Sequence, residues 1–348
     1  MDAPYSNKKI RVLVVDDSMF FRRALSDNLS RDARIEVVGM AVDAIDAMNK
    51  IRTLKPDVVT LDVEMPHLNG IDFLKQLIPV HPMPVVVVSS APIRALDALD
   101  AGAVDFVRKP DIKNPEATTA FMTELVLKVK IASNAHVGVK KTASRFFGSM
   151  HLNSGAGRNK VIAIGASTGG TEAILSVVKD LPDTTPGIVI VQHMPPVFTN
   201  MYAQRLDRIC NMHVVEATNG ARVEKGKIII GAGEFHLRLA KDVQGYYVKS
   251  EPGPKVSGHC PSVDVLFESV ALAAGSNSMG VILTGMGADG ANGLLKMRKA
   301  GAYTIGQDKE SCVVYGMPMV ANNIGAVQKQ FPLNEIGAEI IHHLNSGV

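Results

Sequence analysis

Five polar side chains in the first third of the chain have the types and spacing that a phosphoryl-transfer site needs. Asp16 and Asp17 follow one apolar run, Asp62 and Ser89 end two others, and Lys109 follows a fourth. Three carboxylates placed together repel one another unless a cation lies between them, and such oxygen ligands suit Mg²⁺. Asp62 could then be the nucleophile towards a phosphoryl donor, with Lys109 and the metal neutralising the transferred oxygens. Ser89 would hydrogen-bond the phosphoryl group.

A second set of residues has the pattern of a serine hydrolase. Ser167 lies in the segment GASTGGT at 165–171, directly after an apolar run. A Gly-x-Ser-x-Gly turn between a strand and a helix exposes the serine hydroxyl above the sheet, and N–H groups at the helix start can stabilise an oxyanion. The alternative is a glycine-rich phosphate loop of a nucleotide-binding fold. It fits less well, because the spacing is not GxGxxG and no lysine follows the glycines.

A serine nucleophile needs a base and a group that orients the base. His193 follows the apolar run at 187–192, and Asp289 lies in the segment GMGADG at 285–290. Taken singly, His193 is more often a structural histidine and Asp289 a turn or cap residue. Both nevertheless come just after a buried strand, as Ser167 does, so that the three can meet. This common position predicts a Ser167–His193–Asp289 triad, in a chain order that differs from the Ser, Asp, His order of α/β hydrolases.

The elements that would position the acidic cluster alternate along residues 8–132. Fully apolar strands separated by helices indicate a parallel sheet covered on both faces, whose ligand site lies at the carboxyl ends of its strands. Singly, Asp17 or Ser18 could cap a helix and Asp62 could be a loop residue, but their shared place at strand ends favours the phosphoryl site. The predicted strands are 10–15, 35–40, 58–62, 85–90 and 105–107, and the predicted helices are 20–29, 44–54, 70–77, 95–101 and 116–132.

The alternation resumes at Lys160, after a segment at 133–159 that is rich in Gly, Ser, Lys and Arg and reads as a linker rather than as a poorly patterned helix. Strands are predicted at 161–165, 187–192, 280–284 and 303–306, and helices at 172–179, 200–208, 263–274 and 293–300. The runs at 228–231 and 246–250 are interpreted as strands of a more antiparallel insert. The predicted fold class is therefore α/β, with a five-stranded doubly wound parallel domain followed by a second doubly wound α/β domain at 160–346.

Composition sets limits on the class of protein. The 348 residues suggest two domains at about 150 residues each, and 46% apolar with 20% charged residues exclude a disordered or coiled-coil chain. A net charge of +3 is too weak to indicate a nucleic-acid surface. Apolar runs such as 85–88 fall far short of the roughly 20 residues of a membrane span, and no signal peptide is visible. Three distant cysteines (Cys210, Cys260 and Cys312) favour a reducing, cytoplasmic compartment.

The first domain resembles the receiver domain of bacterial two-component response regulators. The resemblance is carried by VVDDS at 14–18, LDVEMP at 61–66 and VRKP at 107–110, and it covers residues 8–132. It implies that a partner histidine kinase phosphorylates Asp62 and that Asp16, Asp17 and Asp62 hold Mg²⁺. One departure is the short segment between Ser90 and Gly102, from which we expect a fourth helix that is about one turn shorter than usual.

The second domain is similar to the catalytic domain of chemotaxis protein-glutamate methylesterases. The matching segments are IGASTGGT at 164–171, QHM at 192–194, GHCPSVD at 258–264 and LTGMGADG at 283–290. The resemblance implies these catalytic roles: Ser167 as nucleophile, His193 as base, Asp289 as orienting group, the Met286 N–H in the oxyanion hole and Thr168 in support. No cofactor is implied for the ester chemistry. His259 and Cys260 are expected to bind substrate, and the family commonly has arginine at the position of Cys260.

The two resemblances together imply hydrolysis of glutamate methyl esters on the cytoplasmic helices of methyl-accepting chemoreceptors. They also imply a second activity, the deamidation of receptor glutamine to glutamate. A chemotaxis histidine kinase would phosphorylate the receiver, which is expected to cover the Ser167 cleft until then. One alternative is a receiver-gated serine hydrolase with another substrate. Another is a binding adaptor with a degenerate triad, against which the intact Ser167, His193 and Asp289 argue. A DNA-binding output is poorly supported because no basic recognition helix is visible.

Overall fold

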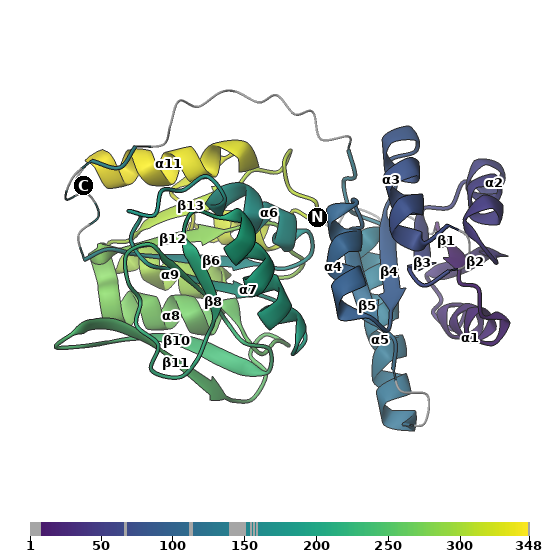
Figure 1. Ribbon diagram of the computed structural model, residues 1–348, viewed down its shortest axis with the longest axis horizontal. Coiled ribbons are helices and arrows are strands. Elements are labelled where there is room, and N and C mark those ends of the chain that lie inside the picture. Colours follow the sequence, from purple (N-terminus) through teal and green to yellow (C-terminus); the bar gives the residue numbers. More distant parts are fainter. Residues whose placement is uncertain are drawn as a thin grey trace. The chain divides into compact units, whose positions relative to one another are not determined.

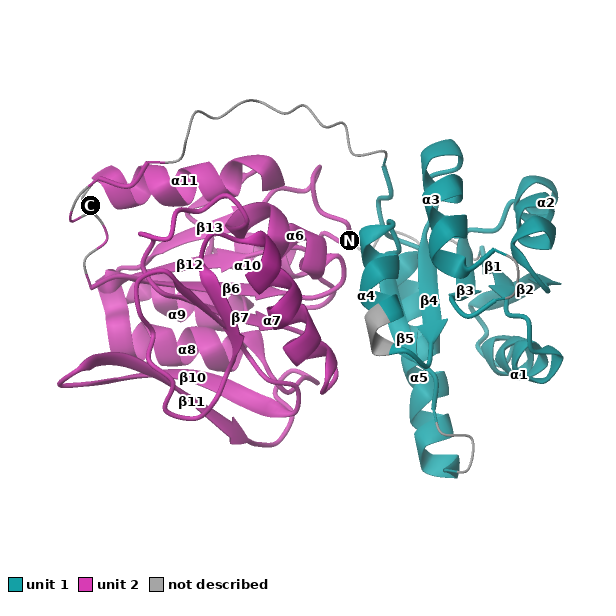
Figure 2. Ribbon diagram, in the orientation of Figure 1, with its two compact units in different colours: residues 1–142 teal, residues 143–348 magenta. Residues whose placement is uncertain are grey.

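The computed structural model describes residues 8–65, 68–110, 114–138, 151–153, 155, 157 and 159–346, and for residues 92 and 93 it describes the backbone alone (Figure 1). The chain forms two compact units, residues 1–142 and 143–348 (Figure 2). Most of the predicted linker at 133–159 lies outside the described residues. Within the described ranges, no helix has both the length and the apolar character that a membrane span requires.

The first unit is a five-stranded parallel sheet with the strand order β2-β1-β3-β4-β5. Helix α1 packs with α5, while α2, α3 and α4 form a row in which neighbours touch. The chain order reverses between β1 and β3, so the crevice at their carboxyl ends is the place where such a sheet binds ligands. The elements are β1 (Ile10–Val15), α1 (Met19–Leu29), β2 (Ile35–Ala41), α2 (Ala44–Leu54), β3 (Val58–Asp62), α3 (Gly70–Val80), β4 (Val85–Ser89), α4 (Pro92–Asp100), β5 (Asp105–Arg108) and α5 (Pro115–Ala132).

Helix α4 begins earlier than its sequence pattern predicts. The expected start was residue 95, but the helix begins at Pro92, because proline is favourable in the first turn, where its missing N–H costs nothing. It has 9 residues, against 11 in each of α1, α2 and α3. It is therefore about half a turn shorter than each of these three helices.

The second unit is built on a seven-stranded parallel sheet with the order β14-β13-β12-β6-β7-β9-β8. From β6 the chain moves first towards β7 and later towards β12, and right-handed crossovers in opposite directions place helices on opposite faces. Figure 1 shows α6 and α7 on one side and α8 and α9 on the other. The elements are β6 (Val161–Ala166), α6 (Gly170–Val178), β7 (Ile188–Gln192), α7 (Phe198–Ile209), β8 (His213–Glu216), β9 (Lys227–Ile230), β10 (Phe235–Asp242), β11 (Gly245–Pro252), α8 (Val263–Ala274), β12 (Ser278–Ile282), α9 (Ala291–Lys299), β13 (Tyr303–Gln307), α10 (Met317–Asn323), β14 (Lys329–Phe331) and α11 (Leu333–Ser346).

The predicted antiparallel insert is only partly present. Strands β10 and β11 form an antiparallel pair, which contains the predicted strand at 246–250. The run at 228–231 was assigned to the same insert, and this was wrong, since β9 pairs in parallel with both β7 and β8. Its isoleucines are completely buried, as expected for a strand inside a parallel sheet with both faces covered.

Candidate functional site

The acidic cluster forms at the carboxyl ends of β1 and β3. Asp16 and Asp62 are almost completely buried, and the Lys109 ammonium, which follows β5, lies 2.9 Å from Asp16 Oδ2 and 2.6 Å from Asp62 Oδ2. Carboxylate oxygens of Asp16, Asp17 and Asp62 lie within 4.8 Å of one another. The structure thus brings together four of the five residues that the sequence predicted for this site.

Two buried carboxylates share one ammonium in this cluster, so negative charge is in excess. Burial raises the pKa of Asp16, and the charge of Asp62 adds to this effect despite the opposing Lys109. For Lys109, burial lowers the pKa, but the hydrogen bonds and charges of Asp62 and Asp16 outweigh it and the net shift is upward. An oxygen-only donor set with excess negative charge fits Mg²⁺; Asp16, Asp17 and Asp62 would hold it.

Ser89 belongs to the same edge, but its hydroxyl bonds within its own loop. Ser89 Oγ accepts a hydrogen bond from the N–H of Ala91 at 3.1 Å and lies 3.3 Å from the Ala91 carbonyl oxygen. The backbone of Ser89 is tied to the cluster, because its carbonyl accepts the Lys109 N–H at 2.9 Å. Among the described residues, Ser89 thus lies beside the cluster without a hydrogen bond to either buried carboxylate.

Ser167 stands at the junction of β6 and α6, in the centre of the second sheet. Its N–H donates to the carbonyl of Thr284, after β12, at 3.0 Å, and its carbonyl accepts the Gly170 N–H at 2.7 Å. Gly169 has a φ of +76° and caps α6 without a side-chain hydrogen bond, so no side chain occupies the first N–H groups of that helix. The glycine at position 169 thus takes a left-handed conformation, which favours glycine.

His193 and Asp289 meet at the same edge of the sheet. His193 Nε2 lies 2.8 Å from Asp289 Oδ2, and both side chains are buried. Burial by itself raises the pKa of Asp289, but its bond to His193 and its other hydrogen bonds outweigh this and hold the pKa below the ordinary value. An ionised carboxylate only accepts, so Nε2 carries the proton and Nδ1 of the neutral ring keeps its lone pair. Nδ1 is buried and has no hydrogen-bond partner among the described residues.

Asp289 is held by the first turn of α8. Its Oδ1 accepts the Ser262 hydroxyl at 2.7 Å and the Asp264 N–H at 3.0 Å, while its Oδ2 accepts the Val263 N–H at 2.7 Å. A helix N-terminus favours a carboxylate through its free N–H groups and its dipole. Together with His193, these donors compensate the burial of the charge.

The remaining predicted residues surround this arrangement. Met286 is 47% exposed and lies in the turn between Thr284 and Asp289. Thr168 is buried, and its carbonyl accepts the Thr284 hydroxyl at 3.0 Å. Ser167, His193 and the turn that contains Asp289 thus follow the ends of β6, β7 and β12, which are adjacent strands.

His259 and Cys260 precede α8. The imidazole of His259 stacks on that of His193, with ring centroids 3.7 Å apart and an angle of 8° between the rings. Cys260 is partly exposed, burial raises the pKa of its thiol, and its carbonyl accepts the Glu234 N–H at 3.2 Å. The sequence grouped these two residues as substrate contacts, and the structure places one of them directly on the imidazole of His193.

Comparison with known proteins bears on this geometry. Residues 162–340 match the CheB methylesterase family, and residues 12–120 match the response regulator receiver domain. The chain belongs to the CheB methylesterase family. It is 53% identical over 338 residues to "Protein-glutamate methylesterase/protein-glutamine glutaminase 2" of Syntrophomonas wolfei, covering 97% of this chain and 98% of the relative.

Two further CheB-family relatives agree with this assignment. The protein-glutamate methylesterase/protein-glutamine glutaminase of Escherichia coli O157:H7 is 45% identical over 345 residues, covering 97% of this chain and 98% of the relative. The crystal structure of the Thermotoga maritima CheB methylesterase catalytic domain is 36% identical with a TM-score of 0.52, covering 53% of this chain and 98% of that one. The predicted α/β fold class, receiver domain and hydrolase class are confirmed.

Two residues that support this CheB-family site had no role in the sequence analysis. The side-chain amide of Gln192, at the end of β7, donates to the carbonyls of Ser167 at 2.9 Å and His193 at 3.3 Å. Ser262 caps α8 and binds Asp289. The sequence contains a recognisable pattern at each position: Gln192 is the polar residue that ends an apolar strand, and Ser262 directly precedes an apolar helix. Their partners Ser167 and Asp289, however, lie 25 and 27 residues away in the sequence.

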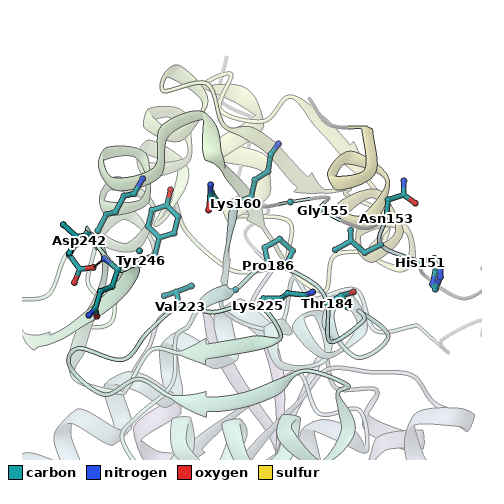
Figure 3. A pocket seen from close by; sticks show the side chains of 18 residues that line it. His151, Asn153, Gly155, Lys160, Thr184, Pro186, Val223, Lys225, Asp242 and Tyr246 are labelled. Carbon is teal, nitrogen blue, oxygen red and sulfur yellow. Dashed lines mark hydrogen bonds between the residues drawn. The ribbon is translucent and has the colours of Figure 1, made fainter.

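One pocket of this methylesterase-family chain is lined by residues remote from Ser167, His193 and Asp289. It has a volume of about 1170 Å³, and Figure 3 shows Asp242 and Tyr246 at one side and His151 and Asn153 at the other. Lys160, which also lines it, directly precedes β6. The pocket therefore lies at the amino ends of the strands, whereas Ser167 lies at the carboxyl end of β6. Neither Ser167, His193 nor Asp289 lines it.

Proposed function

We propose that this chain hydrolyses glutamate γ-methyl esters on the cytoplasmic helices of chemoreceptors through Ser167, His193 and Asp289, and that it deamidates glutamine at the same site. The observation that carries the proposal is the 2.8 Å bond of His193 Nε2 to Asp289 at the sheet edge that presents Ser167. The names of the relatives, which give both activities, support the choice of substrate.

The first half of the reaction transfers the acyl group to the enzyme. His193 Nδ1 accepts the proton of the Ser167 hydroxyl while Oγ attacks the ester carbonyl carbon. Asp289 stabilises the imidazolium that forms. When the tetrahedral intermediate collapses, the bond to the methoxy oxygen breaks and His193 returns the proton to it. Methanol leaves, and an ester between Ser167 and the glutamyl side chain remains.

The second half releases the product. Water attacks the acyl-enzyme carbonyl, gives a proton to His193 Nδ1, and the proton then returns to Ser167 Oγ as the acyl bond breaks. The free glutamate carboxylic acid leaves and ionises. With glutamine as the substrate, the same steps release ammonia in place of methanol.

Each tetrahedral intermediate carries an oxyanion that needs hydrogen-bond donors. The Met286 N–H is our candidate for one donor, since it lies in the turn between Thr284, which binds Ser167, and Asp289. The N–H groups of the first turn of α6 are a second source, because Gly169 provides no side chain to cap them. Hydrogen-bond donors that are fixed in place before the reaction stabilise the oxyanion more than water molecules do, because water must first reorganise. Thr168 supports this turn through its bond with Thr284.

The receiver would regulate this reaction through Asp62. We assign Asp62 as the phosphorylation site, with a chemotaxis histidine kinase as phosphodonor. Mg²⁺, when bound by Asp16, Asp17 and Asp62, neutralises charge on the transferred phosphoryl oxygens. Lys109 would remain close to the phosphorylated Asp62, and the Ser89 hydroxyl would exchange its bonds within the loop for one to the phosphoryl group.

Methanol release from methylated chemoreceptor membranes tests the proposed function. The wild-type chain should release methanol and Ser167→Ala should not, because the loss of a triad nucleophile costs about 10⁶-fold in kcat. Ser276→Ala, at an exposed serine before β12, is the matched control and should retain the activity. Release by Ser167→Ala at the wild-type rate would exclude the nucleophile. If a fluorophosphonate labels Ser167 but the wild type releases no methanol, the proposed substrate is wrong.

A further inference from the structure

The stacked pair of imidazoles joins two distant parts of the chain. His193 directly follows β7, whereas His259 lies in the loop between β11 and α8. Their centroids are 3.7 Å apart and their planes differ by only 8°, so the two rings lie flat on each other. The mechanism above uses His193 and gives His259 no task.

The loop that carries His259 is fixed at several points. Its backbone N–H and carbonyl both bond with Val256, each at 2.9 Å. A buried imidazole, that of His236, fastens the two ends of the loop: its Nε2 lies 2.8 Å from the Pro254 carbonyl oxygen and its Nδ1 accepts the Ser262 N–H at 3.3 Å. The loop can therefore hold the ring of His259 in one place.

The stacked ring of His259 can fix the plane of the His193 imidazole, which the bond to Asp289 alone does not fix. That bond holds one edge of the His193 ring at Nε2, but the torsion between Cβ and the imidazole has broad minima. A turn about this torsion changes the direction of the Nδ1 lone pair, which must point at Ser167. A ring lying parallel at 3.7 Å opposes such a turn, because it would drive atoms of one ring into the other.

We propose that His259 is a positioning residue, which fixes the plane of the His193 imidazole and so directs Nδ1 at Ser167. The proposal rests on the triad assigned above. The same segment also holds Asp289, through Ser262 and the first N–H groups of α8. Residues 256–264 thus constrain the base on its face and the orienting group at its carboxylate. This role differs from the substrate contact that the sequence led us to expect.

The rate at which a small fluorophosphonate labels Ser167 separates the two roles. A substrate contact changes KM for chemoreceptors and leaves this rate unaltered, whereas a positioning residue sets the rate for any electrophile. In the full-length chain we expect His259→Leu to lower the labelling rate by about 10- to 100-fold, as small misplacements of reacting groups do. His259→Phe keeps a flat ring, so its labelling rate should be much closer to that of the wild type. His342→Leu, at an exposed histidine of α11, is the matched control.

Each outcome decides the proposal. Labelling of His259→Leu at the wild-type rate would overturn it, and so would equal losses in the leucine and phenylalanine variants. If the leucine variant does not fold, as judged by thermal unfolding, His259→Ala serves in the same comparison. Labelling of the wild type but not of Ser167→Ala keeps the proposed nucleophile whatever the His259 variants do. Absence of wild-type labelling would refute the proposed triad and the positioning role with it.

Discussion

His193 binds its carboxylate partner through Nε2, and this choice of nitrogen determines the rest of the site. In the Ser-His-Asp arrangement of chymotrypsin-like proteases, the aspartate binds Nδ1 and the serine faces Nε2. Here the order is reversed, so the nitrogen left for Ser167 is the one nearer the backbone of residue 193. The backbones of the two residues must then approach closely. They do so, because the His193 N–H donates to the carbonyl of Ala166 at 3.2 Å and Gln192 bonds to both loops.

Ser262→Ala tests how Asp289 is held. The hydroxyl donates to a buried carboxylate at 2.7 Å, and a hydrogen bond to a charged group contributes about 1.5–3 kcal/mol. The free energy of unfolding at pH 7 should fall by about this amount. The folded-state pKa of Asp289 lies below its ordinary value of 3.8, so the carboxylate stabilises the fold above 3.8 and loses this effect as the pH falls through the lowered pKa. Removal of the donor raises that folded pKa, so the difference in unfolding free energy between wild type and variant should narrow as the pH falls through the lowered pKa of Asp289.

Urea unfolding followed by tyrosine fluorescence reads out this prediction. Tyr202, Tyr246, Tyr247, Tyr303 and Tyr315 lie in the second unit, so five of the six tyrosines report on it. Ser269→Ala on the same helix is the control, because its hydroxyl bonds only to backbone groups of Leu239 and Leu266. The Ser269→Ala control should lower the free energy of unfolding by an amount that does not change with pH. If Ser262→Ala also lowers the free energy of unfolding by an amount that is independent of pH, its hydroxyl does not stabilise the ionised Asp289.

At the scale of elements, β6 places Ser167 between the strands that precede His193 and Asp289. It is paired with β7 on one side and with β12 on the other, so the loops after these strands reach Ser167 from both flanks. Gly285 makes the approach on the β12 side possible: a Cβ there would lie 2.7 Å from Ser167 Cβ and 2.3 Å from Met317 Sδ. Real Cβ atoms do not come so close to other heavy atoms, so any side chain must displace the turn.

Gly285→Ala should therefore lower the labelling rate of Ser167 by about 10- to 100-fold through displacement of the nucleophile. Gly231→Ala is a matched control at the end of β9, where the nearest side-chain atoms would lie at 3.4 Å and a methyl group fits. Fluorophosphonate labelling, together with thermal unfolding of both variants, measures the effect. Equal rates for the two variants would show that the turn adapts without moving Ser167.

The strand ends that carry the site could be predicted from sequence, whereas strand pairing could not. Each of β6 and β7 is a short apolar run that stops at a polar residue, and this local pattern identifies Ser167 and His193. The run at 228–231 has the same local pattern, but its parallel pairing with β7 and β8 depends on contacts far away in the sequence. Strand β14 was not predicted, because its three residues, Lys-Gln-Phe, carry no apolar pattern. The stack of His259 on His193 likewise follows from the path of a loop rather than from its sequence.

At the scale of the whole molecule, each compact unit carries its own site at the carboxyl edge of its own parallel sheet. Asp62 and Ser167 belong to different units and share no described hydrogen-bond partner. An effect of phosphorylation on ester hydrolysis must then arise from a change in the populations of the states of the whole chain. The effect of phosphorylation on the rate is limited in size. Phosphorylation can shift the populations of an active and an inactive state only by the difference in free energy with which it stabilises them.

Asp62→Asn tests this coupling. With Mg²⁺ and a small acyl phosphate, the wild-type chain should release methanol from chemoreceptor membranes about 5- to 150-fold faster, the range of typical coupling free energies. Asp62→Asn should show no response, because an amide is not a nucleophile towards phosphorus, whereas Asp27→Asn, at an exposed aspartate of α1, should respond as the wild type does. An acyl phosphate that leaves the wild-type rate unchanged would separate the two sites and refute the switch. Fluorophosphonate labelling of Ser167, measured in parallel, shows where phosphorylation acts. If the labelling rate rises together with methanol release, phosphorylation changes the proposed triad itself. If the labelling rate stays constant, phosphorylation changes only the access of the large substrate to Ser167.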